Sequence, residues 1–82
     1  MTDTEVLNIV ISSLEEVSGV ANITPDMTYN DIALSSIDAV EFVIDLEQQF
    51  NKILDQFHFF ENIHGEMTIQ ESLSIYIDAL EG

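Results

Sequence analysis

The fold is decided by residues 31–50, which read D-I-A-L-S-S-I-D-A-V-E-F-V-I-D-L-E-Q-Q-F. A loop ends at Ser35 and Ser36, and apolar residues recur at helical spacing after them. A serine hydroxyl at a helix N-terminus accepts a hydrogen bond from a backbone N–H group that would otherwise lack a partner. At least one of these serines is therefore predicted to lie at the positive end of a helix dipole, where a phosphate would be stabilised.

The helix predicted over about residues 36–50 carries apolar side chains on two faces rather than in one stripe. One face, which we expect to be core, holds Phe42, Val43, Leu46 and Phe50. The other face is predicted to be a docking patch with an apolar centre and a charged rim, and it holds Ile37, Val40 and Ile44, with Asp38, Glu41 and Asp45 on one flank and Glu47 on the other. The alternative is a central helix that is buried on both faces.

The same stretch resembles the prosthetic-group site of acyl carrier proteins, in which D-S-L and an acidic residue begin the second helix. Here the motif is Ser35-Ser36-Ile37-Asp38, and the similarity continues through Ala39-Val40-Glu41-Phe42-Val43 to Leu46, Glu47 and Phe50. The likeness is specific only over residues 31–50, although the length, the acidity and the order of helices also suit the family. One departure is that Ser35 stands where the family has aspartate.

The resemblance implies a 4′-phosphopantetheine group that is joined through a phosphodiester to Ser36 and carries acyl groups as thioesters on its thiol. Ser36 is preferred to Ser35 because only that register places Ile37 and Asp38 where the family has leucine and an acidic residue. The implied function is an acyl carrier that presents intermediates to enzymes of fatty acid or polyketide type biosynthesis. An aminoacyl or peptidyl carrier, and an acidic docking module that is never modified, are the alternatives.

The composition limits the partners. Sixteen acidic residues stand against one basic residue, Lys52, and the formal net charge is −15. This balance argues against binding to nucleic acids or to anionic membranes, whose phosphates require Lys and Arg. It favours proteins with basic patches, although acidity that only confers solubility is the alternative. We expect a phosphopantetheinyl transferase, and acyl-transferring and condensing enzymes with basic patches, as partners of a monomer.

No sequence pattern predicts catalysis by the chain itself. There is no glycine-rich phosphate loop, no metalloprotease or calcium-loop motif and no nucleophile elbow around Ser36. His58 and His64 would not share a helix face, and the chain has no cysteine, so no metal site is predicted. The N-terminus lacks the basic region of a signal peptide, and no apolar run could span a bilayer. We therefore expect a cytoplasmic protein that is not an enzyme.

The remaining sequence predicts an all-α fold. A first helix is expected from about Asp3 to Ser18, after a T-x-x-E capping box and before Gly19. A second capping box begins a last helix from about Thr68 to Leu80. Between the first two helices, residues 19–35 form a long loop that must be pinned by its own apolar residues, which are Val20, Ile23, Met27, Tyr29, Ile32 and Leu34.

A short third helix is expected around residues 55–63, where apolar residues have roughly helical spacing from Ile53 to Ile63. We expect Phe57, Phe59 and Phe60 to be core, and a weaker hypothesis is that some of them line a cleft for an acyl chain. The prediction is a single domain over residues 1–82, a small four-helix bundle of acyl-carrier type with a long first loop and a short third helix.

Overall fold

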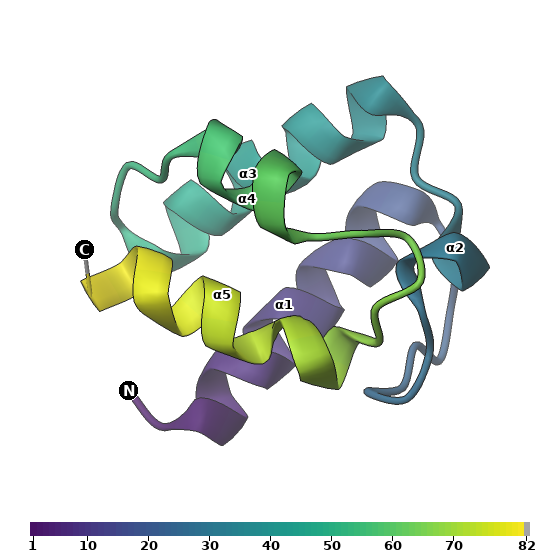
Figure 1. Cartoon of the computed structure of the whole chain (residues 1–82), viewed down its shortest axis with the longest axis horizontal. Helices are drawn as coiled ribbons and strands as arrows, with labels where there is room; N and C mark the ends of the chain where they lie inside the picture. Colours follow the sequence, from purple (N-terminus) through teal and green to yellow (C-terminus); the bar gives the residue numbers. More distant parts are fainter. Residues whose placement is uncertain (82) are drawn as a thin grey trace.

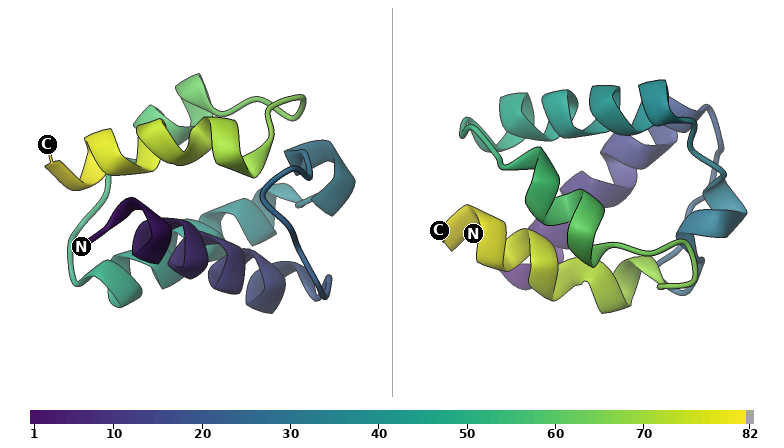
Figure 2. Two further views of the ribbon diagram at one scale, coloured as in Figure 1. Left: turned by 90° about the horizontal axis from the view of Figure 1, so that it is seen from below. Right: turned by 45° about the horizontal axis from the view of Figure 1, so that its top comes forward.

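The computed structural model describes residues 1–81, so Gly82, the last residue of the predicted domain, lies outside the described part. The helices are α1 (Asp3–Ser18), α2 (Tyr29–Ile32), α3 (Ser36–Phe50), α4 (Gln56–Asn62) and α5 (Ile69–Glu81). Figure 2 shows two layers, in which α1 and α3 lie on one side and α4 and α5 on the other. The all-α fold of acyl-carrier type is confirmed, and no helix within residues 1–81 is long and apolar enough to cross a membrane.

The predicted ends of α1 are confirmed in detail. The Thr2 hydroxyl accepts a hydrogen bond from the Glu5 N–H group at 3.2 Å, and the Glu5 carboxylate accepts one from the Thr2 N–H group at 3.1 Å. Gly19 ends the helix with φ +76°, a left-handed conformation that costs glycine little because it has no Cβ. The capping box predicted at the start of α5 is also present, since Thr68 and Glu71 exchange the same pair of bonds.

The core lies where the two layers meet. The predicted core face of α3 is confirmed, because Phe42, Val43 and Leu46 are buried. The Phe42 ring meets the Tyr76 ring edge to face, with centroids 6.2 Å apart, and this offset geometry is favourable for aromatic pairs. The buried apolar residues are Val6, Val10, Leu14, Ile23, Ile32, Phe42, Val43, Leu46, Leu54, Phe59, Ile69, Leu73 and Tyr76.

The long first loop contains a one-turn helix, α2, that the sequence analysis did not predict. Thr28 and Asp31 form a capping box around its start, and Ala33 ends it with φ +55°. Four residues are too few for apolar periodicity to be visible, so only the caps mark the helix. The predicted pinning of the loop is confirmed, because Ile23 and Ile32 are buried and the other four apolar residues pack against the core.

Backbone hydrogen bonds fasten this loop to the α4–α5 connection and to the start of α5. The N–H groups of Tyr29, Asn30, Ile69 and Gln70 donate to the carbonyl groups of Met67, Gly65, Met27 and Pro25, in that order, over 2.9–3.2 Å. Figure 1 shows α2 beside the connection that links α4 to α5. The loop is therefore held at and before the start of α2, and the buried Ile32 at the end of α2 also helps to fix where α3 begins.

The prediction that all three phenylalanines of the third helix are core is wrong for two of them. Phe59 is 4% exposed, whereas Phe57 is 75% exposed and Phe60 is 50% exposed. The assumed periodicity began at Ile53, but α4 begins only at Gln56, and Ile53 is 88% exposed in the preceding connection. Within α4, Phe59 points into the core, Phe60 is at the border between the core and the solvent, and Phe57 faces the solvent.

Candidate functional site

Ser35 caps α3. Its hydroxyl oxygen accepts a hydrogen bond from the Asp38 N–H group at 3.1 Å, and its carbonyl oxygen accepts one from the Ala39 N–H group at 2.9 Å. The backbone of Ser35 is extended, with φ −73° and ψ 168°, as an N-cap residue requires. The prediction of a serine cap at this point is confirmed, and Ser35 is the residue that provides it.

Ser36 is the first residue of α3, and its side chain is exposed. Within residues 1–81 its hydroxyl group makes no hydrogen bond, and the N–H groups of Ser36 and Ile37 have no acceptor. An exposed hydroxyl thus lies beside two unpaired N–H groups at the positive end of a helix dipole. This arrangement suits a phosphate ester, because both N–H groups can donate to phosphate oxygens.

The position of this hydroxyl is fixed by packing on the N-terminal side. Leu34 is half-buried and packs against the core, and only the cap residue Ala33 separates it from the pinned helix α2. A group attached at Ser36 would therefore leave the molecule from a defined point rather than from a mobile loop.

The predicted apolar docking side chains are exposed. Ile37 is 72% exposed, Val40 is 39% exposed and Ile44 is 44% exposed, whereas the opposite face of α3 is in the core. The alternative of a helix buried on both faces is therefore wrong. Exposed large apolar side chains that adjoin one another on one helix are typical of an interaction surface.

The four predicted acidic residues of this surface have different surroundings. Asp45 accepts a hydrogen bond from the buried Ser13 hydroxyl of α1 at 2.6 Å. Glu47 accepts one from the Leu54 N–H group at 2.9 Å and so fastens the α3–α4 connection. Asp38 and Glu41 make no such side-chain bond within residues 1–81. Two of the four carboxylates thus have structural partners, and Asp38 and Glu41 are available to a protein that binds here.

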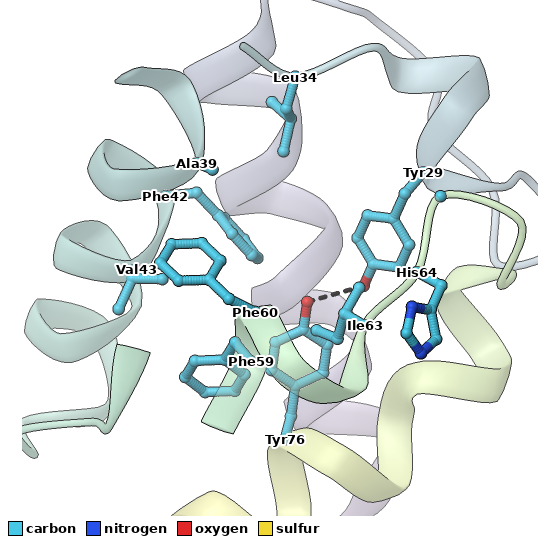
Figure 3. Close-up of a pocket in the computed structure, with 11 residues that line it drawn as sticks. Tyr29, Leu34, Ala39, Phe42, Val43, Phe59, Phe60, Ile63, His64 and Tyr76 are labelled. Carbon is cyan, nitrogen blue, oxygen red and sulfur yellow. Dashed lines mark hydrogen bonds between the residues drawn. The ribbon is translucent and has the colours of Figure 1, made fainter. Parts of the chain in front are cut away.

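An apolar cavity of about 160 Å³ lies between α2, α3 and α4 (Figure 3). Its lining residues are Tyr29, Leu34, Ala39, Phe42, Val43, Phe59, Phe60, Ile63, His64, Gly65 and Tyr76. Phe59 and Phe60 line this cavity, whereas Phe57 does not, and the entry of an acyl chain into it stays a prediction. Ala39 and Leu34 place one wall of the cavity next to the N-terminus of α3, where Ser36 lies.

A chain of hydroxyl groups lies against this cavity. The Tyr29 hydroxyl oxygen is 2.7 Å from that of Tyr76 and 2.6 Å from that of Ser72, and the Ser72 hydroxyl donates to the Ile69 carbonyl at 2.7 Å. Because the Ser72 proton is used in this way, Tyr29 donates to Ser72 and Tyr76 donates to Tyr29. Figure 3 shows the bond between the two tyrosines as a dashed line. The chain links the first loop to α5.

Burial controls the ionisation of these tyrosines. It raises the pKa of Tyr29 above 10.0 and that of Tyr76 well above 10.0, and the neighbouring Tyr29 raises the pKa of Tyr76 further. Both hydroxyl groups therefore remain neutral at neutral pH. Their protons are engaged within the protein, so the cavity offers an incoming group mainly apolar contacts.

The sequence analysis missed the Ser13–Asp45 bond and the hydroxyl chain. Ser13 and Ser72 lie at positions of α1 and α5 that their apolar periodicity assigns to the core, and a polar residue there indicates a buried hydrogen bond. Only the partner of each serine could not be predicted.

Among the described residues, no group of three histidine or acidic side chains could hold a metal ion. The Nε2 atom of His58 lies 3.3 Å from the Ile75 carbonyl oxygen, and His64 is one of the residues that line the cavity.

A family model described as "phosphopantetheine attachment site" matches residues 8–63. No curated protein and no solved structure gives a significant match. The matched range extends from α1 through α4, so it includes both serines, all of α3 and most of the cavity lining. Proteins of this family bear a 4′-phosphopantetheine group on a serine and are carriers rather than catalysts. Because the match covers more than half of the 82 residues, the chain belongs to the phosphopantetheine-binding carrier proteins.

Proposed function

We propose that this chain is an acyl carrier protein of the cytoplasm, a single carrier domain over residues 1–82 with 4′-phosphopantetheine attached to Ser36. It would present acyl intermediates to enzymes of fatty acid or polyketide type biosynthesis. The observation that carries the proposal is the difference between the two serines. The Ser36 hydroxyl is exposed and makes no bond within residues 1–81, whereas the Ser35 hydroxyl caps the helix.

Attachment at Ser35 would disturb the helix. The Ser35 hydroxyl oxygen would either lose its hydrogen bond from the Asp38 N–H group or have to accept that bond as an ester oxygen of the phosphate. Loss of an N-cap costs about 1 kcal/mol. Attachment at Ser36 requires no such loss. The sequence register and the hydrogen bonding therefore favour the same residue.

The protein's own contribution is to hold and orient the group. When bound, the group supplies a thiol on which acyl chains are carried as thioesters. The N–H groups of Ser36 and Ile37 are placed to donate to the phosphodiester, and the pinned helix α2 sets the direction in which it leaves the surface. A tethered acyl chain then reaches each partner at a high effective concentration.

The cavity supports an apolar acyl cargo over an aminoacyl cargo. An apolar cavity of about 150 Å³ in a protein core holds a benzene molecule, so the cavity of about 160 Å³ matches an apolar group of about six carbon atoms. A charged ammonium group would lose its hydration there without gaining a counter-charge, because both tyrosine hydroxyls remain neutral.

The exposed surface of α3 is proposed to contact the partner enzymes. Ile37, Val40 and Ile44 would provide the apolar centre, and Asp38 and Glu41 would face basic residues of the partner. Asp45 and Glu47 would lie at the margin, where their internal bonds hold them in place.

Intact mass measurement tests the attachment. The wild type, Ser36→Ala and Ser35→Ala are each incubated with coenzyme A and a broad-specificity phosphopantetheinyl transferase. We expect the wild type and Ser35→Ala to gain one phosphopantetheine and Ser36→Ala to gain none. Modification that persists in Ser36→Ala and disappears in Ser35→Ala would move the site to Ser35.

The second candidate function, an acidic docking module, would be favoured if the wild type gained nothing under conditions in which a control carrier is fully modified. The mass of the protein isolated from its own host, with any cargo still attached, then distinguishes an acyl from an aminoacyl group. An aminoacyl adduct would contradict the proposed cargo and leave the attachment site unchanged.

A further inference from the structure

The hydroxyl groups of Tyr29, Ser72 and Tyr76 are used neither by the attachment site nor by the docking surface of α3. Ser72 and Tyr76 are buried in α5, and Tyr29 is half-buried at the start of α2. Alanine and phenylalanine would fill nearly the same space without placing polar groups in the core, where each of them requires a partner. The bonds among these hydroxyl groups tie α2 to α5, and one of the oxygen atoms has bonding capacity left over.

The bond from Ser72 fixes the direction of this chain of hydroxyl groups. The Ser72 hydroxyl donates to the Ile69 carbonyl group one turn earlier in α5, so its oxygen is left to accept from Tyr29. The Tyr29 oxygen then accepts from Tyr76 over 2.7 Å. Within residues 1–81 no proton of the chain remains for the Tyr76 oxygen, which therefore donates one hydrogen bond and accepts none.

The Tyr76 hydroxyl group lies against the cavity. Its ring is part of the cavity lining and packs against the rings of Phe42 and Phe59, with centroids 6.2 Å and 5.3 Å away. Figure 3 shows the hydroxyl group directed between the lining side chains, toward Tyr29. An oxygen atom with an unused lone pair thus adjoins a cavity that is lined mostly by apolar side chains.

This acceptor distinguishes between chemical groups of the same size. A hydroxyl group that enters the cavity can donate to the Tyr76 oxygen, and this bond replaces one that the group loses from water. A ketone oxygen only accepts hydrogen bonds, so it would remain without a partner or would have to break the bond between Tyr76 and Tyr29. The cavity is therefore suited to a group that donates.

We propose that the Tyr76 oxygen accepts a hydrogen bond from a hydroxyl group of the cargo, so that the cavity prefers a hydroxyacyl chain to the oxoacyl chain of the same length. Tyr76 determines this specificity. Tyr29 and Ser72 are positioning residues, because they direct the Tyr76 proton away from the incoming group. The identity of the occupant as cargo rests on the proposed function, whereas the preference for a hydroxyl group rests on the cavity alone.

The test is the binding of two free probes, cyclohexanol and cyclohexanone, to the unmodified protein. Both are rings of about the size of benzene, which fits an apolar cavity of about 150 Å³. NMR titrations of the wild type, Tyr76→Phe and Ser72→Ala give the dissociation constants. The amide shifts of Ala39 and Gly65, which line the cavity, show whether the probe is bound there.

We expect the wild type to bind cyclohexanol about tenfold more tightly than cyclohexanone, as one additional hydrogen bond allows. Tyr76→Phe keeps the ring but removes the acceptor, so the two dissociation constants should agree within about threefold. Ser72→Ala should have the same effect, because the Tyr29 proton is then free to turn toward Tyr76, whose own proton can face a ketone.

Equal affinities of the wild type for the two probes, tighter binding of cyclohexanone, or an unchanged preference in Tyr76→Phe would each overturn the inference. Binding of neither probe would overturn it as well, since the cavity would then not admit a group of this size. If the melting temperature shows that one variant is unfolded, the other variant decides the comparison. The probes do not require Ser36, so a preference in a chain that the transferase fails to modify would overturn the proposed function and keep the hydroxyl-selective cavity.

Discussion

At the scale of single residues, the two adjacent serines have separate roles because only one hydroxyl can cap a helix. Ser35 is in the extended N-cap conformation, and Ser36 already has helical geometry. The family's aspartate at the first position is also a strong N-cap residue, so serine can replace it without loss of the cap. The departure from the family motif therefore preserves the structural role of that position.

Removal of this cap should destabilise the protein. Ser35→Ala leaves the Asp38 N–H group without its acceptor, and we expect a loss of about 1 kcal/mol in the free energy of unfolding. Ser35→Asp should retain full stability, and Ser36→Ala should change it little because its hydroxyl makes no bond within residues 1–81. Urea unfolding of the three variants measures these differences. A loss for Ser36→Ala without a loss for Ser35→Ala would mean that the roles of the serines are reversed.

The buried tyrosines should make the fold sensitive to alkali. In the unfolded chain a tyrosine loses its proton near pH 10, whereas burial keeps Tyr29 and Tyr76 protonated above that pH. The unfolded state then binds fewer protons than the folded state, so stability is fully present below about pH 10 and falls as the pH rises further. The expected slope approaches about 1.4 kcal/mol per pH unit for each tyrosine.

Urea midpoints between pH 8 and 11 check this prediction, and Tyr76→Phe is the control. This variant removes one of the two titrating groups, so its decline above pH 10 should be about half as steep. The same slope in both proteins would show that the ionisation of Tyr76 does not cause the alkaline unfolding.

At the scale of elements, α3 combines three roles on different parts of its surface. One face is core, the N-terminus presents Ser36, and the exposed surface holds Ile37, Val40 and Ile44, the last of which shares a groove with two carboxylates of the same helix. Hydrogen bonds on both flanks keep the helix in place while its apolar surface faces the solvent. Asp45 accepts one from Ser13 of α1, and Glu47 accepts one from Leu54 in the connection to α4.

Reversal of one charge on α3 should slow association with a basic partner. We expect Glu41→Lys to lower the association rate with the transferase several-fold at low salt, while the dissociation rate changes less. Glu66→Lys is the matched control, because it changes the net charge equally at an exposed site outside α3 and α4. Stopped-flow binding at several salt concentrations measures both rates. Equal slowing by the two variants would assign the effect to net charge rather than to a contact on α3.

At the scale of the whole molecule, charge is distributed very unevenly. The single basic residue, Lys52, donates a hydrogen bond to the Leu80 carbonyl group near the end of α5, where a positive charge is favourable. The sixteen acidic residues repel one another across a molecule whose dimensions are 28 × 25 × 21 Å. Folding brings these charges closer together and is therefore opposed by their repulsion.

Salt should consequently stabilise the fold. The screening length falls from about 30 Å at 0.01 M to about 8 Å at 0.15 M ionic strength, which is well below the dimensions of the molecule. We expect the melting temperature to rise by several degrees over this range, and to rise further with a millimolar divalent cation. Differential scanning calorimetry at fixed pH measures the change. A flat response would show that repulsion does not limit stability.

The sequence by itself determined the α1, α3 and α5 helices and the surface of α3. Capping boxes and helical periodicity are local, since they depend on residues three or four positions apart, and the predicted bounds were accurate for this reason. Periodicity also separated the core face of α3 from Ile37, Val40 and Ile44, whose exposure is confirmed. It failed at Phe57 because the spacing was counted through the connection around Ile53, which is not helical.

Only the tertiary structure decided which polar and aromatic side chains meet. Ser13 binds Asp45 from 32 positions away, and Tyr29 reaches Tyr76 from 47 positions away, so no local pattern could predict either pair. The cavity likewise depends on how α4 packs against α3, because a short helix can turn either face inward at little local cost. The sequence thus predicts short-range hydrogen bonds, whereas contacts between helices depend on packing that only the folded chain defines.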